Sequence, residues 1–362
     1  MQSSVFFGLS TVAYILAMIA YITYIAFKNR GIGVAATGIT IAGFASQTTA
    51  ILLRWSEFYR FSGMGLIRSI PLTNLYESLV FFVWCLILGY LIIEFKYKNR
   101  SFGAFVTPVA GLALAFIDLS GMSKDIQPLV PALQSNWLLV HVMMSFIAYA
   151  AFALSFSTGL MYLIATTEKR KEASYFFWSI TFGIFAVVLV SMGIDWFIYK
   201  GAGMKPEAFI RSYLFKSTFM SGSGAVQAVS YILGALLIFV IWRYGYVLKR
   251  VIEGFKLSPE MLEEITYKSI AIGFPIFTLG GLIFGAIWAD QAWGVYWSWD
   301  PKETWSLITW FVYAFYLHAR LLRGWRGHKI SVVAVMGFVA VIFTYLGVNL
   351  LLSGLHAYGS ME

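Results

Sequence analysis

The sequence predicts an all-α polytopic membrane protein, and three observations support this prediction. Of its 362 residues, 60% are hydrophobic and only 12% are charged. The mean hydropathy is +0.77, and the apolar residues gather in long stretches of the kind that span a bilayer, which needs roughly 20 apolar residues per helix. This composition excludes an ordinary soluble domain.

Ten stretches are apolar enough to be spans: 5–27, 32–53, 75–95, 101–117, 137–165, 175–199, 226–248, 268–288, 304–322 and 331–352. The fourth is the shortest, so we expect eight to ten transmembrane helices. No basic residue precedes the first stretch, which is also too long for the core of a secretory signal, so we interpret it as a span. The loops are short and show no repeat, so residues 1–362 are expected to form a single membrane domain.

The basic residues predict the orientation, because basic loops are retained on the cytoplasmic side. An outside N-terminus places 17 of the 26 Lys and Arg inside. The net charge of +9 therefore reflects topology and contact with anionic lipid headgroups, and nucleic-acid binding is not expected. The loop 200–225 is the exception, since it is basic and predicted to lie outside.

The helical pair at 174–250, which flanks this loop, is therefore open to a second interpretation as a re-entrant or peripheral pair. Removing both helices from the count leaves every other loop on the same side. The segment 289–305, between spans eight and nine, is on the outer face in either case.

This outer segment combines aromatic residues with a compact polar cluster. Tryptophans also gather at membrane interfaces as anchors, which is sufficient to explain Trp55 and Trp137. Anchoring does not require the polar neighbours, and so much flat aromatic surface favours a platform for a large planar ligand. The residues concerned are Trp293, Gly294, Tyr296, Trp297, Trp299, Asp300, Pro301, Lys302, Glu303 and Trp305.

The polar part of the segment also predicts a helix start. Asp300 is expected at the N-cap, Pro301 at the first helical position and Glu303 at capping-box spacing. Asp300 and Glu303 also lie close enough to the platform to orient donors or meet a proton, although pairing with Lys302 is the simpler interpretation. A helix cap and a ligand surface can coexist in one segment.

The predicted topology places the four histidines at different depths and on different sides of the membrane. His141 and His356 are expected at outer helix ends flanking the aromatic segment, His318 near the inner end of span nine, and His328 in an inner basic loop. A lone histidine at a helix end is usually an interfacial hydrogen-bonding group. Because low-spin heme takes one axial imidazole on each face, two outer histidines beside the aromatic segment favour a bis-histidine heme site.

His318 cannot share a metal with this outer pair. It lies 16 residues beyond Lys302, which is ~24 Å along a helix. An ionisable residue within a span is a functional candidate by default, although nearness to the inner interface gives it access to water. The single cysteine, Cys85, excludes an internal disulfide and is interpreted as a small buried apolar residue.

Several motifs together resemble the CcsA/ResC cytochrome c synthetase family. They are the tryptophan-rich signature at 293–305, Tyr-Leu-His-Ala-Arg at 316–320, Gly-Leu-His-Ala-Tyr-Gly at 354–359, Pro-Leu-Thr-Asn-Leu-Tyr-Glu-Ser at 71–78 and Asn-Trp-Leu-Leu-Val-His-Val at 136–142. The resemblance covers most of the chain, and the tryptophan-rich signature is highly specific. The additional pair at about 175–248 departs from the shorter members and has no assigned role.

The resemblance implies a heme-handling protein whose signature, the WWD segment, holds heme at the outer face. His141 and His356 would be the axial ligands, and His318 a heme ligand in a separate inner site. The platform would consist of Trp293, Trp297, Trp299 and Asp300, with Gly294, Tyr296, Pro301, Lys302 and Glu303 also at the heme. The opposing inner histidine is expected from a CcsB/ResB-type membrane partner.

The implied activity is that of a holocytochrome c synthetase subunit, a heme lyase active with its partner. It attaches heme b through thioether bonds to apocytochromes carrying Cys-x-x-Cys-His, so Cys85 is not needed. Thiol-reducing proteins are a further class of partner. The expected location is a bacterial cytoplasmic membrane or a thylakoid membrane, with attachment on the periplasmic or lumenal side.

Three alternatives stay open at this point. The first is a heme exporter or chaperone of the WWD superfamily without ligase activity. The second is a heme-b quinone oxidoreductase subunit, which would need histidine pairs at matching depth inside the bilayer. The third is a solute transporter, which leaves the tryptophan segment unexplained. For heme propionates, topology offers Lys302, Arg54, Arg60 and Arg68 on the outer side.

Overall fold

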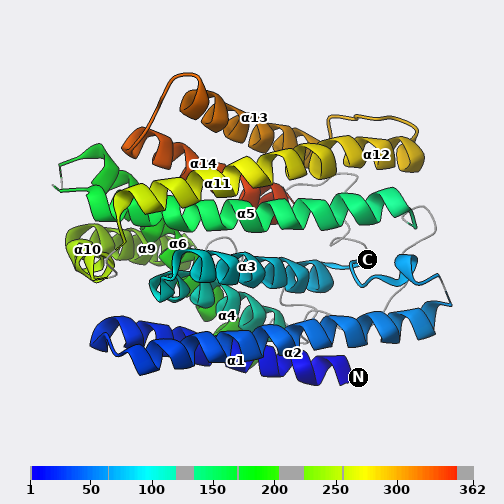
Figure 1. Ribbon diagram of the computed structural model, residues 1–362, viewed down its shortest axis with the longest axis horizontal. Helices are drawn as coiled ribbons and strands as arrows, with labels where there is room; N and C mark the ends of the chain where they lie inside the picture. The colour runs from blue at the N-terminus through cyan, green and yellow to red at the C-terminus, as the bar shows by residue number, and fades with distance from the viewer. Residues whose placement is uncertain are drawn as a thin grey trace.

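The computed structural model describes residues 2–63, 65–119, 134–168, 171–203, 224–254 and 257–348. These residues form a bundle of long helices (Figure 1), and no strand occurs among them. As far as it is described, each of the ten apolar stretches falls on one helix or on a run of consecutive helices. The predicted all-α membrane architecture is therefore confirmed.

The first half of the chain builds one side and the centre of the bundle. Its elements are α1 (Gln2–Phe27), α2 (Arg30–Ser62), the 3-10 turn η1 (Ile67–Ser69), α3 (Leu75–Tyr97), the 3-10 turn η2 (Arg100–Phe102), α4 (Gly103–Leu119) and α5 (Asn136–Thr166). Helix α5 is central: it packs against α3 on one side and against α11 and α14 on the other (Figure 1).

The second half includes two segments of π-helix. Its elements are α6 (Ala173–Gly201), α9 (Gly224–Tyr244), α10 (Tyr246–Glu253), α11 (Pro259–Phe277), the π-helix η4 (Thr278–Phe284), α12 (Gly285–Trp293), α13 (Pro301–Leu321), α14 (His328–Ile342) and the π-helix η5 (Phe343–Gly347). The expected additional pair forms α6 and α9, which pack against each other.

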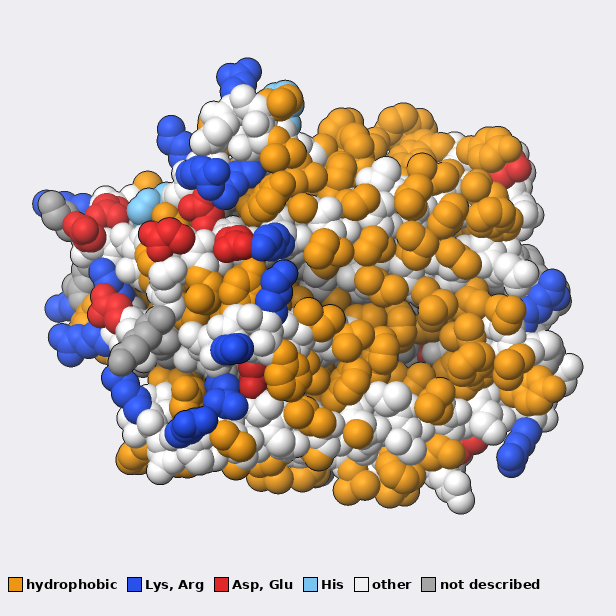
Figure 2. All heavy atoms as spheres, in the orientation of Figure 1, with side chains coloured by type: hydrophobic (Ala, Val, Ile, Leu, Met, Phe, Trp, Pro, Cys, Tyr) orange, Lys and Arg blue, Asp and Glu red, His pale blue; other side chains and the backbone are white. Residues whose placement is uncertain are grey.

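Seven of the described helices are long and apolar enough to cross a membrane: Gln2–Phe27, Arg30–Ser62, Tyr76–Tyr97, Asn136–Thr166, Gln227–Tyr244, Pro259–Trp293 and His328–Gly347. Shorter apolar helices cover Arg100–Ala115 and Ala173–Val187. On the face shown in Figure 2, hydrophobic side chains cover the middle and much of the end opposite α10, and most Lys and Arg lie at the end where α10 lies. The protein is thus a multi-pass membrane protein, and eight to ten crossings stay a prediction.

Two helices extend beyond their predicted bounds. Helix α2 continues to Ser62, so Arg54 and Arg60 lie on a helix. Helix α11 begins at Pro259, because the Ser258 side chain caps it by accepting from the Met261 N–H. The apolar pattern alone does not include these polar helix ends.

A buried ion pair fixes α2 against the start of α3. Arg54 Nε lies 2.8 Å from Glu77 Oε1, and both side chains are only 2% exposed. The other Glu77 oxygen accepts from the Thr73 N–H at 2.8 Å and from the Thr73 hydroxyl at 2.9 Å. A buried carboxylate needs such partners, and here they hold the 71–78 motif in place.

Candidate heme site

The π-helix η4 places a backbone carbonyl against His141 of α5. Pro275, inside α11, has no N–H and so removes one bond of the helical ladder just before η4. Gly280 lies against Met144 so closely that a Cβ would overlap that side chain. At this contact His141 Nδ1 lies 2.7 Å from the Gly280 oxygen. Such π-helical segments occur frequently at functional sites.

Two further residues of the same helical run contact the His141 ring. A Cβ built at Gly285 would lie 2.9 Å from both Nδ1 and Cε1 of His141. The Trp288 ring is nearly parallel to the imidazole, at 13°, with ring centroids 6.4 Å apart. Trp288 is 2% exposed. His141 therefore sits against a buried wall formed by η4 and α12.

The tryptophan-rich segment 293–305 starts where α12 ends. Gly294 caps α12 with φ of 75°, and its N–H bonds to the Asp290 carbonyl at 2.9 Å. The Trp293 ring is 6.0 Å from that of Trp288, with planes at 73°. Through Trp288, the first tryptophan of the segment is connected to His141.

Two aromatic residues of the segment, Tyr296 and Trp299, are exposed. Trp299 is 70% exposed and Tyr296 is 62% exposed. The rings of Trp297 and Trp299 meet edge to face at 5.9 Å. Trp299 has φ of 61°, which is a strained backbone conformation for a bulky residue. Strained backbone of this kind clusters at active sites and ligand-binding sites.

Helix α13 begins as predicted, with Asp300 at the N-cap and Pro301 first. The buried Asp300 carboxylate accepts from the Lys302 N–H at 3.0 Å. Glu303 accepts from the N–H of Ser298 at 2.7 Å and from its hydroxyl at 3.1 Å. The capping-box spacing predicted that Glu303 would accept from the Asp300 N–H. Glu303 accepts from Ser298 instead, because the left-handed backbone at Trp299 turns Ser298 toward Glu303.

Lys302 connects this helix start to η5. Burial lowers the pKa of Lys302 to about 8, and the Asp300 carboxylate opposes that change. Its ammonium lies 6.0 Å from the ring centroid of Tyr345, whose hydroxyl is 2.5 Å from that of Ser78. Lys302 is therefore a cation held over an aromatic ring at the edge of the platform.

The π-helix η5 lies beside the first turns of α13. In η5, the Thr344 hydroxyl donates to the Trp305 carbonyl at 3.1 Å. The ring of Phe343 is 4.1 Å from that of Trp305. His356 itself lies outside the described residues, so its role as second axial ligand stays a prediction.

His318 lies in the last turn of α13, far from the outer site, with an exposed side chain. It is part of an exposed apolar stripe with Phe311, Phe315 and Leu322, which are 58%, 48% and 75% exposed. Within the described residues it makes no side-chain hydrogen bond or ion pair. His328, by contrast, contacts the Thr166 hydroxyl at 3.0 Å.

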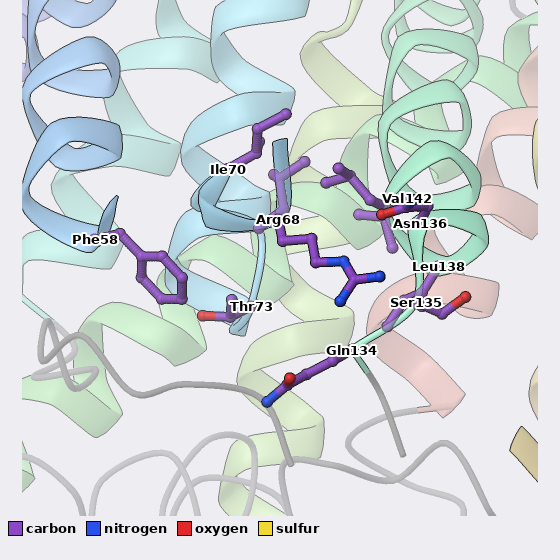
Figure 3. A pocket seen from close by; sticks show the side chains of 11 residues that line it. Phe58, Arg68, Ile70, Thr73, Gln134, Ser135, Asn136, Leu138 and Val142 are labelled. Carbon is purple, nitrogen blue, oxygen red and sulfur yellow. The ribbon is translucent and has the colours of Figure 1, made fainter. Parts of the chain in front are cut away.

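The structure separates the arginines that topology offered for propionates. Arg54 is buried against Glu77 and serves the fold. Arg60 is exposed near the end of α2. The guanidinium of Arg68 points between η1 and the start of α5 (Figure 3), where it lines a cavity of about 40 Å³ together with Ser135 and Asn136.

Gly280, Gly285 and Trp288 were not identified from the sequence. The π-helical turn that gathers them depends on hydrogen-bond register, which composition does not reveal. The available signals were Pro275 inside an apolar stretch and three glycines at 280, 281 and 285, close before a tryptophan segment.

Comparison with known proteins gives the family. A family model described as cytochrome C assembly protein matches residues 72–356. This range includes His141, the WWD segment, His318 and His356. The chain belongs to the CcsA family. The cytochrome c biogenesis protein CcsA of Gloeobacter violaceus is 37% identical over 325 residues, covering 89% of this chain and 86% of that protein.

Other CcsA proteins match over comparable lengths. That of Microcystis aeruginosa is 37% identical, with 95% of this chain and 93% of the relative covered. That of Marchantia polymorpha is 36% identical, with 89% and 88% covered. CcsA family membership supports a role in cytochrome c maturation and implies heme handling.

Proposed function

We propose that this CcsA-family protein binds heme b at an outer WWD site and, with a CcsB/ResB-type partner, attaches it to apocytochromes carrying Cys-x-x-Cys-His. The observation that carries the proposal is the setting of His141. Its imidazole is held by a carbonyl and a buried tryptophan, beside the exposed aromatic segment. Imidazole is a strong axial ligand for heme iron.

The WWD residues supply a surface for the heme. The exposed Trp299 meets the half-buried Trp297 edge to face, and Trp293 connects the platform to the wall behind His141. Gly294 and Pro301 bracket the segment, Tyr296 adds exposed aromatic surface, and Asp300 and Glu303 fix its end. His356 is proposed as the ligand on the opposite face of the heme.

Positive groups near the platform suit the heme propionates. Lys302 lies at the platform edge, and Arg68 lines its cavity near the start of the helix that carries His141. Arg54 is removed from this list by its buried pair with Glu77.

The attachment reaction balances without an oxidant or reductant. Each substrate thiol adds across one heme vinyl group: sulfur bonds to the vinyl carbon next to the ring, and hydrogen goes to the outer carbon. The protein's part is to align the vinyl groups with the thiols, and good alignment lowers a barrier by about 7–11 kcal/mol. The product leaves when the substrate histidine replaces one protein imidazole.

The inner site requires the partner. His318 is exposed on an apolar stripe of α13, as expected for a ligand completed by a histidine from another membrane protein. We propose that heme binds there first and then moves to the outer, periplasmic or lumenal, site. The buried Cys85 takes no part in the reaction.

The test is the reduced absorption spectrum of the complex copurified with its partner. Unaltered protein should show low-spin bis-histidine heme, and His141→Ala and His356→Ala should each lose or shift it. Covalent heme on a co-expressed apocytochrome separates a synthetase from a heme exporter or chaperone, which would bind heme without forming thioethers. Absence of heme in every preparation, given adequate heme supply, would contradict both functions.

A further inference from the structure

Three backbone and side-chain features of one helical run surround the His141 ring. They are the Gly280 carbonyl, the bare Cα of Gly285 and the indole of Trp288, all within η4 and α12. The family signature begins later, at Trp293. The contacts of these three residues give them a role in the heme site.

The carbonyl selects one tautomer of the histidine. A carbonyl oxygen can only accept a hydrogen bond, so the 2.7 Å contact requires a proton on Nδ1 of His141. In a neutral imidazole the lone pair is then on Nε2, the form that binds iron. A hydrogen bond from the remote ring nitrogen also raises ligand basicity.

Gly285 sets how closely the ring can approach the helix. A Cβ there would lie 2.9 Å from two ring atoms of His141, closer than side-chain carbons pack. Alanine at 285 would therefore push the imidazole away from the Gly280 carbonyl. The backbone of Gly285 is helical and would accept any residue, so the contact with His141 is the reason that glycine is needed here.

Trp288 fixes the plane of the ring. Its indole is buried and within 13° of parallel to the imidazole. The same indole contacts the ring of Trp293 at 6.0 Å. Trp288 thus couples the orientation of the axial ligand to the first tryptophan of the platform.

We propose that Gly280, Gly285 and Trp288 form a positioning cradle that holds His141 as the Nδ1–H tautomer with its Nε2 directed to heme iron. This inference rests on the proposed function, because it names the residues that orient one of its ligands. The cradle residues act through His141 and do not touch the reacting atoms.

The experiment compares Gly285→Ala, Trp288→Leu and Trp288→Phe with His141→Ala in the complex copurified with its partner. Heme affinity, the reduced spectrum and the heme reduction potential are measured. We expect Gly285→Ala and Trp288→Leu to lower heme affinity by about 10–100-fold, the range for residues that orient a metal ligand. Trp288→Phe keeps an aromatic face and should retain low-spin heme at a shifted potential.

Added imidazole distinguishes positioning from misfolding. It should restore the low-spin spectrum of Gly285→Ala, as it should that of His141→Ala, because the rest of the site is intact. Gly38→Ala is the matched control, since a Cβ at Gly38 of α2 meets no atom within 4 Å. Gly38→Ala should bind heme like the unaltered chain, with no need for added imidazole.

The outcomes separate the two proposals. If His141→Ala loses the spectrum while Gly285→Ala and Trp288→Leu keep both spectrum and potential, the cradle is wrong and the ligand assignment stands. If His141→Ala keeps the unaltered spectrum and potential, the ligand assignment itself fails, and the cradle fails with it.

Discussion

Two of the three histidines that we propose as heme ligands, His141 and His318, lie within the described residues, and their surroundings are opposite. His141 is held inside the chain by a carbonyl and a buried indole. His318 is exposed on an apolar stripe of α13, and no hydrogen bond or ion pair to its side chain occurs in the described part of the chain. His141 is therefore oriented by its own chain, whereas His318 has no such support among the described residues.

This difference matches what each site must do. A site for thioether formation has to hold heme in one orientation, so pre-positioned ligands favour it. A site that passes heme onward must release it, and a ligand shared between two proteins can be separated. The strained backbone at Trp299 suits the attachment site that we propose.

The largest effect is expected at the outer ligands. His141→Ala or His356→Ala should abolish cytochrome c maturation, because each removes an axial bond to iron, and added imidazole should restore part of it. Maturation is measured as covalent heme on a co-expressed apocytochrome. Full activity of either variant without imidazole would contradict the ligand assignment.

His318→Ala tests the other half of the comparison. It should reduce the total heme that copurifies with the complex while the remaining heme keeps its outer bis-histidine spectrum. His328→Ala is the matched control, because the His328 side chain contacts Thr166 and is not a heme ligand in our proposal. Unchanged heme content in His318→Ala would leave His318 with a structural role only.

The sequence predicted the helices well, because stretches of apolar residues long enough to span a bilayer have few alternatives. It also predicted the Asp300 cap and the burial of Cys85. It did not predict the π-helix η4 or the wall behind His141, because these depend on hydrogen-bond register and on contact between distant helices. The exposure of His318 likewise depends on which face of α13 packs inward.

A third prediction concerns the strain at Trp299. Trp299→Gly and Trp299→Ala both remove the exposed indole and should both reduce heme attachment. Only glycine adopts a φ of 61° without penalty, so Trp299→Gly should be more stable than Trp299→Ala by about 1–2 kcal/mol. Thermal unfolding in detergent measures the difference. Equal stability would show that the backbone there is not strained.

The last prediction, which does not involve heme attachment, is the pH dependence of stability that Lys302 contributes. Its pKa is about 8 in the folded protein, compared with the ordinary lysine value of 10.5 in the unfolded chain. Between these two pH values the unfolded chain holds more protons than the folded one, so the free energy of unfolding rises with pH across this window.

The rise should be on the order of 1–3 kcal/mol, and it should disappear in Lys302→Met. Unfolding is followed from about pH 7 to about pH 11, a range that brackets both pKa values. Lys171→Met, at an exposed lysine between α5 and α6, is the control and should keep the rise. If Lys302→Met also keeps the rise, the Lys302 ammonium is solvated in the folded protein. Lys302 would then be an ordinary surface cation and not a pre-positioned partner for a heme propionate.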